Sequence, residues 1–378
     1  MRATCTTTSR RGSLRNDDGD VVSVSLSEHW GKTVTEHDAL PLKLGGAYGS
    51  PYTLKMRSVL RYRRIPFQWV PRDSKWDDLP PVPVRLIPVI AFPDGDGNYT
   101  EAAIDSSPLI ARLERSHAGR SLVPADPVVA FLDYLIEDYG DEWVTKAMYH
   151  YRWYYEEAAE KAGSLLPLDM DQQMSVEQAE KEKRFITKRQ TGRRARVGST
   201  EENRPVIEQS YERLLDLLQR HITEQPFLLG DRPGRGDFGV FGQLRQLVGW
   251  DPVSARLAVS RAPRVVHWVE RLDDLSWWDV DGDAGWVDRD HVAATTVELL
   301  SEIGRTYVPF MLANAAAFDA EEPEMHCVID GLDYRQGTFP YQHKCLRWLR
   351  DEHAALAPTD RASVDALLAG TGCELLFA

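Results

Sequence analysis

The sequence predicts a small α/β domain followed by an all-helical domain and a further helical extension. Between residues 41 and 120, apolar runs and a helical pattern follow the order β-α-β, and after an irregular connection β-β-α. From Pro127 onward, helical patterns dominate. We therefore divide the chain into four parts, a tail (1–40), an α/β domain (41–120), a helical domain (121–299) with a charged insertion at about 160–204, and an extension (300–378).

Composition and charge exclude several classes of protein. The 378 residues include 58 Asp and Glu but only 45 Lys and Arg, so the formal net charge is −13. An acidic chain repels phosphate backbones, so we expect no nucleic-acid partner. No apolar run reaches transmembrane length, so we expect a soluble protein without a membrane partner. The four cysteines form no CxxC pair, which argues against a disulfide scaffold or a zinc ribbon.

The first forty residues are polar and carry little periodic apolar pattern. Several arginines lie among Ser and Thr residues, and no acid precedes Asp17, so the stretch faintly resembles a transit peptide. A disordered tail is the prediction that we favour for residues 1–40.

Each element of the α/β domain has its own local signal. Leu42 and Leu44 alternate with other residues, as in a strand. Ser50 is a favoured N-cap, Pro51 suits the first helical position, and Pro66 ends the helix that they begin. The remaining elements are strands at 67–70, 89–92 and 99–104, with a hairpin turn at 94–97, and a helix at 106–114 that Ser106 is expected to cap.

The helical part contains two charged clusters. Acidic residues gather at 137–142, near His150. A carboxylate–histidine metal site is one alternative, but no clean Glu-x-x-His spacing occurs, so we predict a solvated acidic face and no metal. Basic residues gather at 181–196, where we favour a solvated helix over an anion-binding patch. Further helices are expected at 205–221, 237–249, 296–318 and 338–356.

Three short segments of the α/β domain resemble those of one known family. They are Gly49–Tyr52 (GSPY) at a helix start, Ile87–Val89 (IPV) before a strand, and Asp105–Ser106 at the last helix. Together they resemble the thioredoxin-like domain of the glutathione S-transferase superfamily. In that family the last pair usually reads Glu-Ser or Gln-Ser, so Asp105 is a departure.

A second resemblance lies downstream. The segments 227–233 (FLLGDRP) and 237–238 (DF) resemble the conserved segment of the family's helical domain. Gly234 stands where that family has a capping Ser or Thr, and Asp237 is expected to be a buried structural residue. The resemblance covers roughly residues 41–275, so it implies a thioredoxin-like domain and an all-helical domain, with the insertion and the extension as additions.

The resemblance implies a glutathione-binding site. It assigns the catalytic position to Ser50, where a hydroxyl and a helix N-terminus can lower the pKa of a thiol and stabilise the thiolate. Pro88 is the candidate cis-proline that turns the backbone of Val89 outward to pair with an extended peptide. Asp105 would face the α-amino group of glutathione and Ser106 its carboxylate. Simple helix capping is the alternative for both Ser50 and Ser106.

The electrophile is expected to bind between the two domains. From the helical domain, Tyr149, Arg152 and Trp153 are the candidate pocket residues, although most aromatics there could equally be core residues. Tyr48 and Tyr52 provide rival hydroxyl groups near the helix start, and Tyr52 falls on the apolar face of that helix.

Three functions follow from these observations. The first is a glutathione transferase that moves alkyl or aryl groups, uses glutathione as co-substrate, and acts on a small hydrophobic electrophile. The second is a non-catalytic binding or assembly protein with the same fold. The third and weaker one is a thiol-disulfide reductase that uses Cys345 or Cys373. The resemblance also implies a cytosolic homodimer.

Overall fold

A computed structural model of the protein describes residues 13–15, 21–23 and 40–378. Two short strands, β1 (Ser13–Arg15) and β2 (Val21–Ser23), pair in antiparallel fashion. The rest of the predicted disordered tail, with its transit-peptide-like stretch, lies outside the described residues. Residues 41–378 form a separate unit, which contains all the remaining elements.

The first domain is a mixed four-stranded sheet in the order β4-β3-β5-β6. Strand β3 pairs in parallel with β4 and antiparallel with β5, which in turn pairs antiparallel with β6. Leu44 and Ile90, opposite each other in neighbouring strands, are completely buried. In chain order the elements are β3 (Leu42–Gly46), α1 (Pro51–Tyr62), β4 (Phe67–Pro71), β5 (Val89–Pro93), β6 (Tyr99–Ile104) and α2 (Ser106–Ser116).

Helix α1 begins and ends as its sequence predicts. Ser50 is the N-cap, and its Oγ accepts a hydrogen bond from the backbone N–H of Thr53 at 3.2 Å. Pro51 occupies the first turn, where its missing N–H costs nothing. The helix packs against α8 of the second domain, so the start of α1 lies at the junction of the two domains.

The second domain is helical throughout. Helix α3 continues through a π-helical segment, Gly140–Val144, into α4, so this stretch is one long bent helix. Its neighbour α8 contacts α1, α3 and the π segment. The helices are α3 (Pro127–Tyr139), α4 (Thr145–Trp153), α5 (Glu156–Leu165), α6 (Val176–Thr191), α7 (Arg204–His221), α8 (Arg235–Gly249), α9 (Pro252–Arg261) and α10 (Pro263–Leu272).

Asp237 organises the start of α8, as predicted. Gly234 is the N-cap, and its N–H donates to Oδ2 of Asp237 at 2.9 Å. The other carboxylate oxygen accepts from the backbone N–H of Leu228 at 2.9 Å. Asp237 is completely buried, so its role is to satisfy these two backbone donors and not to meet a ligand.

The charged insertion forms α5 and α6. None of the residues of α6 is fully buried, which confirms the predicted solvated helix. Among the described residues, no helix combines the length and apolar character needed to cross a membrane.

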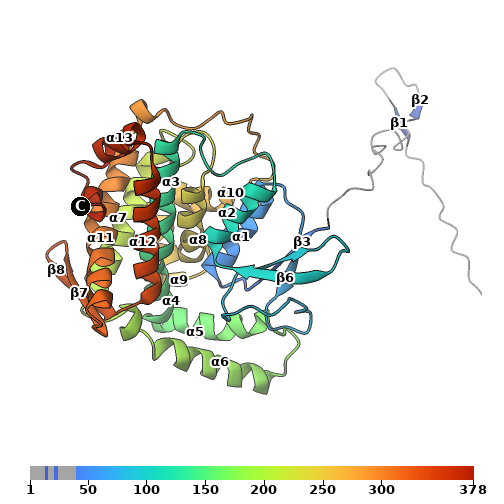
Figure 1. Ribbon diagram of the computed structural model, residues 1–378. Coiled ribbons are helices and arrows are strands. Elements are labelled where there is room, and N and C mark those ends of the chain that lie inside the picture. Colours follow the sequence, from blue (N-terminus) through green and yellow to red (C-terminus); the bar gives the residue numbers. More distant parts are fainter. Residues whose placement is uncertain (1–12, 16–20, 24–39) are drawn as a thin grey trace, which may run out of the picture. The chain divides into compact units, whose positions relative to one another are not determined.

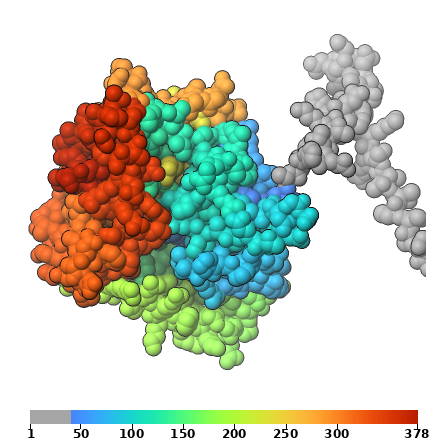
Figure 2. Space-filling view, viewed as in Figure 1, coloured from blue at the N-terminus to red at the C-terminus, as the bar shows by residue number. Residues whose placement is uncertain are grey.

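The C-terminal extension combines helices with a hairpin that our sequence analysis missed. It comprises α11 (Ala294–Asp319), β7 (Glu324–Ile329), β8 (Leu332–Gly337), α12 (Pro340–Ala355) and α13 (Pro358–Leu368). Asp330 and Gly331 form the turn between the strands, both with positive φ, which is a hairpin signal visible in the sequence. Helices α11, α12 and α13 pack on the side of α3 away from α1 and α2 (Figure 1). In the space-filling view the extension fills one side of the molecule (Figure 2).

Candidate functional site

A cavity of about 420 Å³ lies where the first domain, the helical domain and the extension meet. The extension therefore completes a site that the first two domains begin. Its wall consists of Tyr52 from α1; Leu86, Ile87, Pro88, Asp105 and Ser106 from the rest of the first domain; Asp141, Glu142, Thr145, Lys146, Tyr149 and Val197 from the helical domain; and Phe339, Tyr341 and Gln342 from the extension.

The Ile87–Pro88 segment lies in the cavity wall, and the peptide bond between the two residues is cis, as predicted. The prediction for Val89 is wrong. Val89 is completely buried and lies in β5, where Gly45 and Ile104 are its partners on either side. The backbone available to a ligand is that of Ile87, whose N–H and C=O have no hydrogen-bond partner within the part of the chain that the structure describes.

Asp105 and Ser106 lie side by side in the same wall. Asp105 occupies the N-cap position of α2, where Ser106 was expected, and its side chain makes no capping bond. Its φ of 79° is in the left-handed region, which a non-glycine residue adopts at a cost of about 1–3 kcal/mol. Its Oδ2 accepts a hydrogen bond of 2.8 Å from the hydroxyl of Tyr341, and burial raises the pKa of the Asp105 carboxyl.

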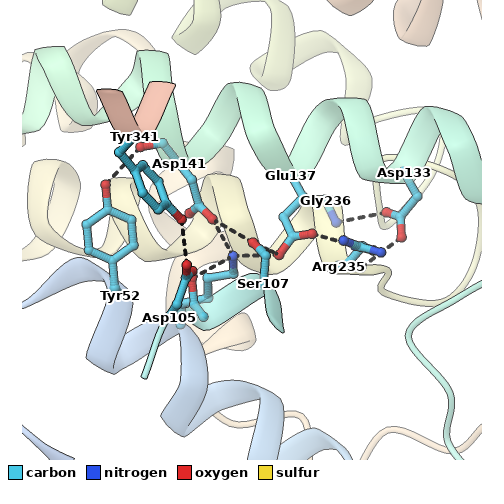
Figure 3. Close-up of polar contacts among 11 residues, drawn as sticks. Tyr52, Asp105, Ser107, Asp133, Glu137, Asp141, Arg235, Gly236 and Tyr341 are labelled. Atoms are coloured by element: carbon cyan, nitrogen blue, oxygen red, sulfur yellow. Dashed lines mark hydrogen bonds and ion pairs between the residues drawn. The ribbon is translucent and has the colours of Figure 1, made fainter. Parts of the chain in front are cut away.

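A buried charge network lies behind this wall. Nζ of Lys55, which is completely buried, donates to Glu137 at 2.7 Å, to Asp141 at 2.5 Å and to Oγ of Ser106 at 3.3 Å. Glu137 also pairs with Arg235 of α8. Figure 3 shows the network running along α3, from Asp141 at one end to Asp133 at the other.

The predicted solvated acidic face is therefore wrong. Each carboxylate-bearing residue between positions 137 and 142 is at most 8% exposed. Lys55 and Arg235, which pair with two of these carboxylates, come from other helices, and the local sequence could not show this. Across the described residues, no group of three or more His, Cys, Asp or Glu side chains is arranged to hold a metal ion.

Burial dominates the electrostatics of this region. It raises the pKa of Asp138, Asp141 and Glu142 to about 7 each, and it lowers that of Lys146 to about 8. Burial would also raise the pKa of Glu137, but Arg235 and Lys55 outweigh it and lower the value to about 2. The cavity thus adjoins three carboxyl groups that titrate near neutral pH.

These shifts predict how pH changes stability. A carboxyl with a raised pKa in the folded state stabilises that state below its unfolded pKa, and this advantage is lost as pH rises through the folded pKa. We expect Glu142→Gln to gain stability over the wild type by roughly 1–3 kcal/mol between pH 5 and pH 7.5, since one pKa unit corresponds to about 1.4 kcal/mol. Urea unfolding of both proteins at each pH measures the difference, and a difference independent of pH would contradict the assignment. His221, whose pKa burial lowers, also makes stability depend on pH. Its contribution is the same in both proteins and therefore cancels in the difference between them.

Ser50 lies beside the cavity but does not line it. The residue is 8% exposed, and its hydroxyl serves as the N-cap of α1. The neighbouring loop is held by other elements, because Nη1 of Arg152 donates to the carbonyl of Gly49 at 2.6 Å and the N–H of Tyr48 donates to Asp169 at 2.9 Å. Tyr48 itself is half exposed and stacks on Trp69, outside the cavity.

Of the other predicted pocket residues, Tyr52 and Tyr149 line the cavity. The hydroxyl of Tyr52 donates to the carbonyl of Asp141 at 2.8 Å. Burial raises the pKa of Tyr52 most, and the negative charges of Glu142 and Asp141 raise it further. The hydroxyl of Tyr149 donates to the carbonyl of Gln190 at 2.6 Å. The structure places Arg152 and Trp153 elsewhere, since Arg152 pairs with buried Asp251 and Trp153 packs in a small cluster with Ala159 and Ala162.

Sequence reasoning missed Lys55 and the three residues from the extension. Lys55 had a signal, because it interrupts the apolar face that Tyr52, Met56 and Val59 form on α1. Tyr341 had none, since it meets Asp105 from 236 positions away.

Cys345 and Cys373, the two cysteines of the reductase hypothesis, lack the character of reactive thiols. Cys345 and Cys373 are buried, and burial raises the pKa of both thiols, that of Cys373 to about 12. A thiol of raised pKa holds little thiolate at neutral pH, which disfavours the reductase hypothesis.

Comparison with known families gives two matches. Residues 44–121 match the family described as Glutathione S-transferase, N-terminal domain, and residues 182–271 match Glutathione S-transferase, C-terminal domain. The second match begins inside the stretch that we interpreted as an insertion. A comparison with curated proteins gave no significant match.

Several solved structures are similar to the chain. One is a beta-etherase from Sphingobium sp. strain SYK-6, with 19% identity and a TM-score of 0.43, covering 62% of this chain and 95% of that one. Another is a glutathione transferase family member from Pseudomonas fluorescens pf-5 with two glutathione molecules bound, with 14% identity and a TM-score of 0.38, covering 61% and 87%. A third is a glutathione S-transferase from Methylobacterium radiotolerans in complex with glutathione sulfonate, with 20% identity and a TM-score of 0.35, covering 62% and 91%.

Proposed function

Since the chain belongs to the glutathione S-transferase superfamily, we propose that its cavity binds glutathione and presents the thiol to a small hydrophobic electrophile. The observation that carries this proposal is the meeting of Ile87–Pro88 and Asp105–Ser106 in one cavity wall. Strands β5 and β6 separate these segments in the chain, and each segment offers the chemistry that one part of a γ-glutamyl tripeptide requires.

The hydrogen-bonding and charged groups in the wall are complementary to those of glutathione. The free N–H and C=O of Ile87 can pair with the peptide backbone of the ligand, as an added strand pairs with a sheet edge. Asp105 can accept the ligand's ammonium group, and the start of α2 with Ser106 can receive its carboxylate. In conjugation, the thiolate sulfur forms a bond to the electrophilic carbon, the leaving group departs with its electron pair, and the thiol proton passes to solvent.

Two hydroxyls compete for the role of stabilising the thiolate. Ser50 stands at the position that the family assigns to catalysis, where the first N–H groups of α1 add partial positive charge. Tyr52 lines the cavity, and its raised pKa keeps its hydroxyl protonated, although that hydroxyl donates to the carbonyl of Asp141. We propose Ser50 for this role, with Tyr52 as the comparison.

We expect Ser50→Ala to bind glutathione as the wild type does but to lower kcat/KM for a generic aryl halide by about tenfold or more, since one catalytic donor is lost. Tyr52→Phe should retain turnover. Calorimetric titration of glutathione and a conjugation assay on all three proteins provide the measurement, with melting temperatures to correct for the lost N-cap, worth about 1 kcal/mol. If kcat/KM falls only in Tyr52→Phe, the hydroxyl that stabilises the thiolate is that of Tyr52 and not that of Ser50.

A non-catalytic binding protein is the second candidate, and one observation favours it. The polar side chains proposed to bind the ligand already form hydrogen bonds within the chain. Asp105 accepts one from Tyr341, and Ser106 accepts one from Lys55. A ligand at 100 times its Kd stabilises the folded state by about 2.7 kcal/mol. If millimolar glutathione leaves the unfolding midpoint unchanged, the enzyme proposal fails and the binding role is favoured. The homodimer and the cytosolic location stay predictions.

A further inference from the structure

The part of the cavity wall that comes from the helical domain and the extension is acidic and aromatic. Asp141 and Glu142 lie together at the π segment, and the rings of Tyr149, Phe339 and Tyr341 surround the same space. Counting Asp105, three carboxyl groups line the cavity. Among the lining residues Lys146 is the one cation, so acidic groups exceed basic ones.

Asp141 has an oxygen that no group in the described structure satisfies. Its Oδ2 accepts from Lys55 at 2.5 Å and from Ser107 at 3.5 Å, whereas its Oδ1 is buried and accepts no hydrogen bond. The residue as a whole is 6% exposed. A buried acceptor without a donor costs about 1–3 kcal/mol, so the cavity wall contains a carboxyl group that its own neighbours satisfy only in part.

Glu142 adds a second buried carboxyl beside it, and the surrounding side chains offset its burial only in part. Lys146 is the cation that most lowers the pKa of Glu142, but it offsets only part of the rise that burial causes in that pKa. Among the described residues neither Lys55 nor Arg235 forms an ion pair with Glu142, because Lys55 pairs with Glu137 and Asp141, and Arg235 pairs with Glu137. The remaining negative charge faces aromatic rings, which attract cations through their π faces.

We propose that the second ligand of this cavity carries a protonated amine attached to an apolar or aromatic body. The amine lies against Asp141 and Glu142, and the body packs among Tyr149, Phe339 and Tyr341. Asp105 is left for glutathione. This inference rests on the proposed function, because it specifies the electrophile as a cationic one. It places the amine at Asp141 and Glu142, whereas the glutathione ammonium is assigned to Asp105.

The test uses two probes of equal shape, 2-phenylethylamine, which is protonated at pH 7, and the neutral 2-phenylethanol. Both are titrated calorimetrically into the full-length protein saturated with glutathione. We expect the amine to bind at least about tenfold more tightly than the alcohol. Equal affinities, or binding of the amine that saturating glutathione abolishes, would overturn the proposal.

Variants assign the preference to its residues. Glu142→Gln should reduce the preference for the amine to about threefold or less. Asp138→Asn is the matched control, since Asp138 is similarly buried but does not line the cavity, and it should keep the preference. Retention of the full preference in Glu142→Gln would count against the site. If that variant fails to fold, the comparison of the two probes on the wild type still decides.

The two proposals can fail separately. Glutathione titrated alone reports on the function, and the amine titrated alone reports on this site. Amine binding without glutathione binding would remove the transferase proposal and retain the cationic site. Glutathione binding with no preference for the amine would do the reverse.

Discussion

Replacing Lys55 by methionine will lower the free energy of unfolding by about 3–5 kcal/mol at pH 7, because it leaves buried carboxylates without their cation. Burial alone would lower the pKa of Lys55, but Asp141 and Glu137 outweigh it, so the side chain is charged in the fold. Methionine has a similar length and adds no polar group, so the loss measures the charge. Urea unfolding followed by fluorescence provides the value.

Two further results identify the cause of this loss. At pH 5 the loss should be smaller, because Asp141, with its pKa near 7, is then neutral. The control is Lys183→Met, which removes a surface pair with Glu160 and should leave the unfolding midpoint near that of the wild type. A Lys55→Met protein as stable as this control would show that the buried network is not a source of stability. The glutathione affinity of the Lys55→Met protein should also fall, since Lys55 donates a hydrogen bond to the hydroxyl of Ser106.

Replacing Arg152 by methionine will also cost about 3–5 kcal/mol, and it should weaken glutathione binding as well. Asp251, the partner of Arg152, is completely buried and would lose its three charge-assisted bonds at 2.9, 3.2 and 3.0 Å. The same guanidinium holds the carbonyl of Gly49, directly before Ser50. Its loss therefore frees the loop that begins α1.

The matched control is Arg256→Met, which breaks an exposed pair with Glu157 and should change neither stability nor binding. Arg152→Lys should restore part of the stability, because one ammonium cannot reach Asp251, Gly49 and Gln246 together as the planar guanidinium does. Equal glutathione affinity in the wild type and in Arg152→Met would show that the loop does not depend on Arg152 for its binding conformation.

Local rules explain what could be predicted from the sequence. The start of α1 depends on Ser50 and Pro51, which are neighbours in the chain, so its signal can be read from the sequence. The position of each predicted strand of the first domain followed in the same way. The cis bond at Pro88 and the role of Asp237 follow instead from the resemblance of their segments to one family. The hairpin with its Asp330–Gly331 turn had such a signal, and we missed it.

Long-range contacts explain the rest. The acidic cluster looks solvated in sequence because Lys55 and Arg235, which neutralise part of it, come from helices far along the chain. Arg152 looks like a pocket residue because nothing local shows that Asp251 will meet it. Tyr341 could not be assigned to the site at all, since its approach to Asp105 depends on how α12 packs.

The composition of the cavity wall has a consequence for biosynthesis. The wall begins at Tyr52 and ends at Gln342, so the chain must be synthesised as far as α12 before the wall can close. Until then Asp105 and Glu142 lack their neighbours from α12, and the apolar surface of α3 that the extension covers faces solvent. Contacts of such large sequence separation form slowly, and nascent chains that expose apolar surface are prone to aggregate. Before the extension is present, the first two domains therefore carry an incomplete cavity wall and an uncovered face of α3.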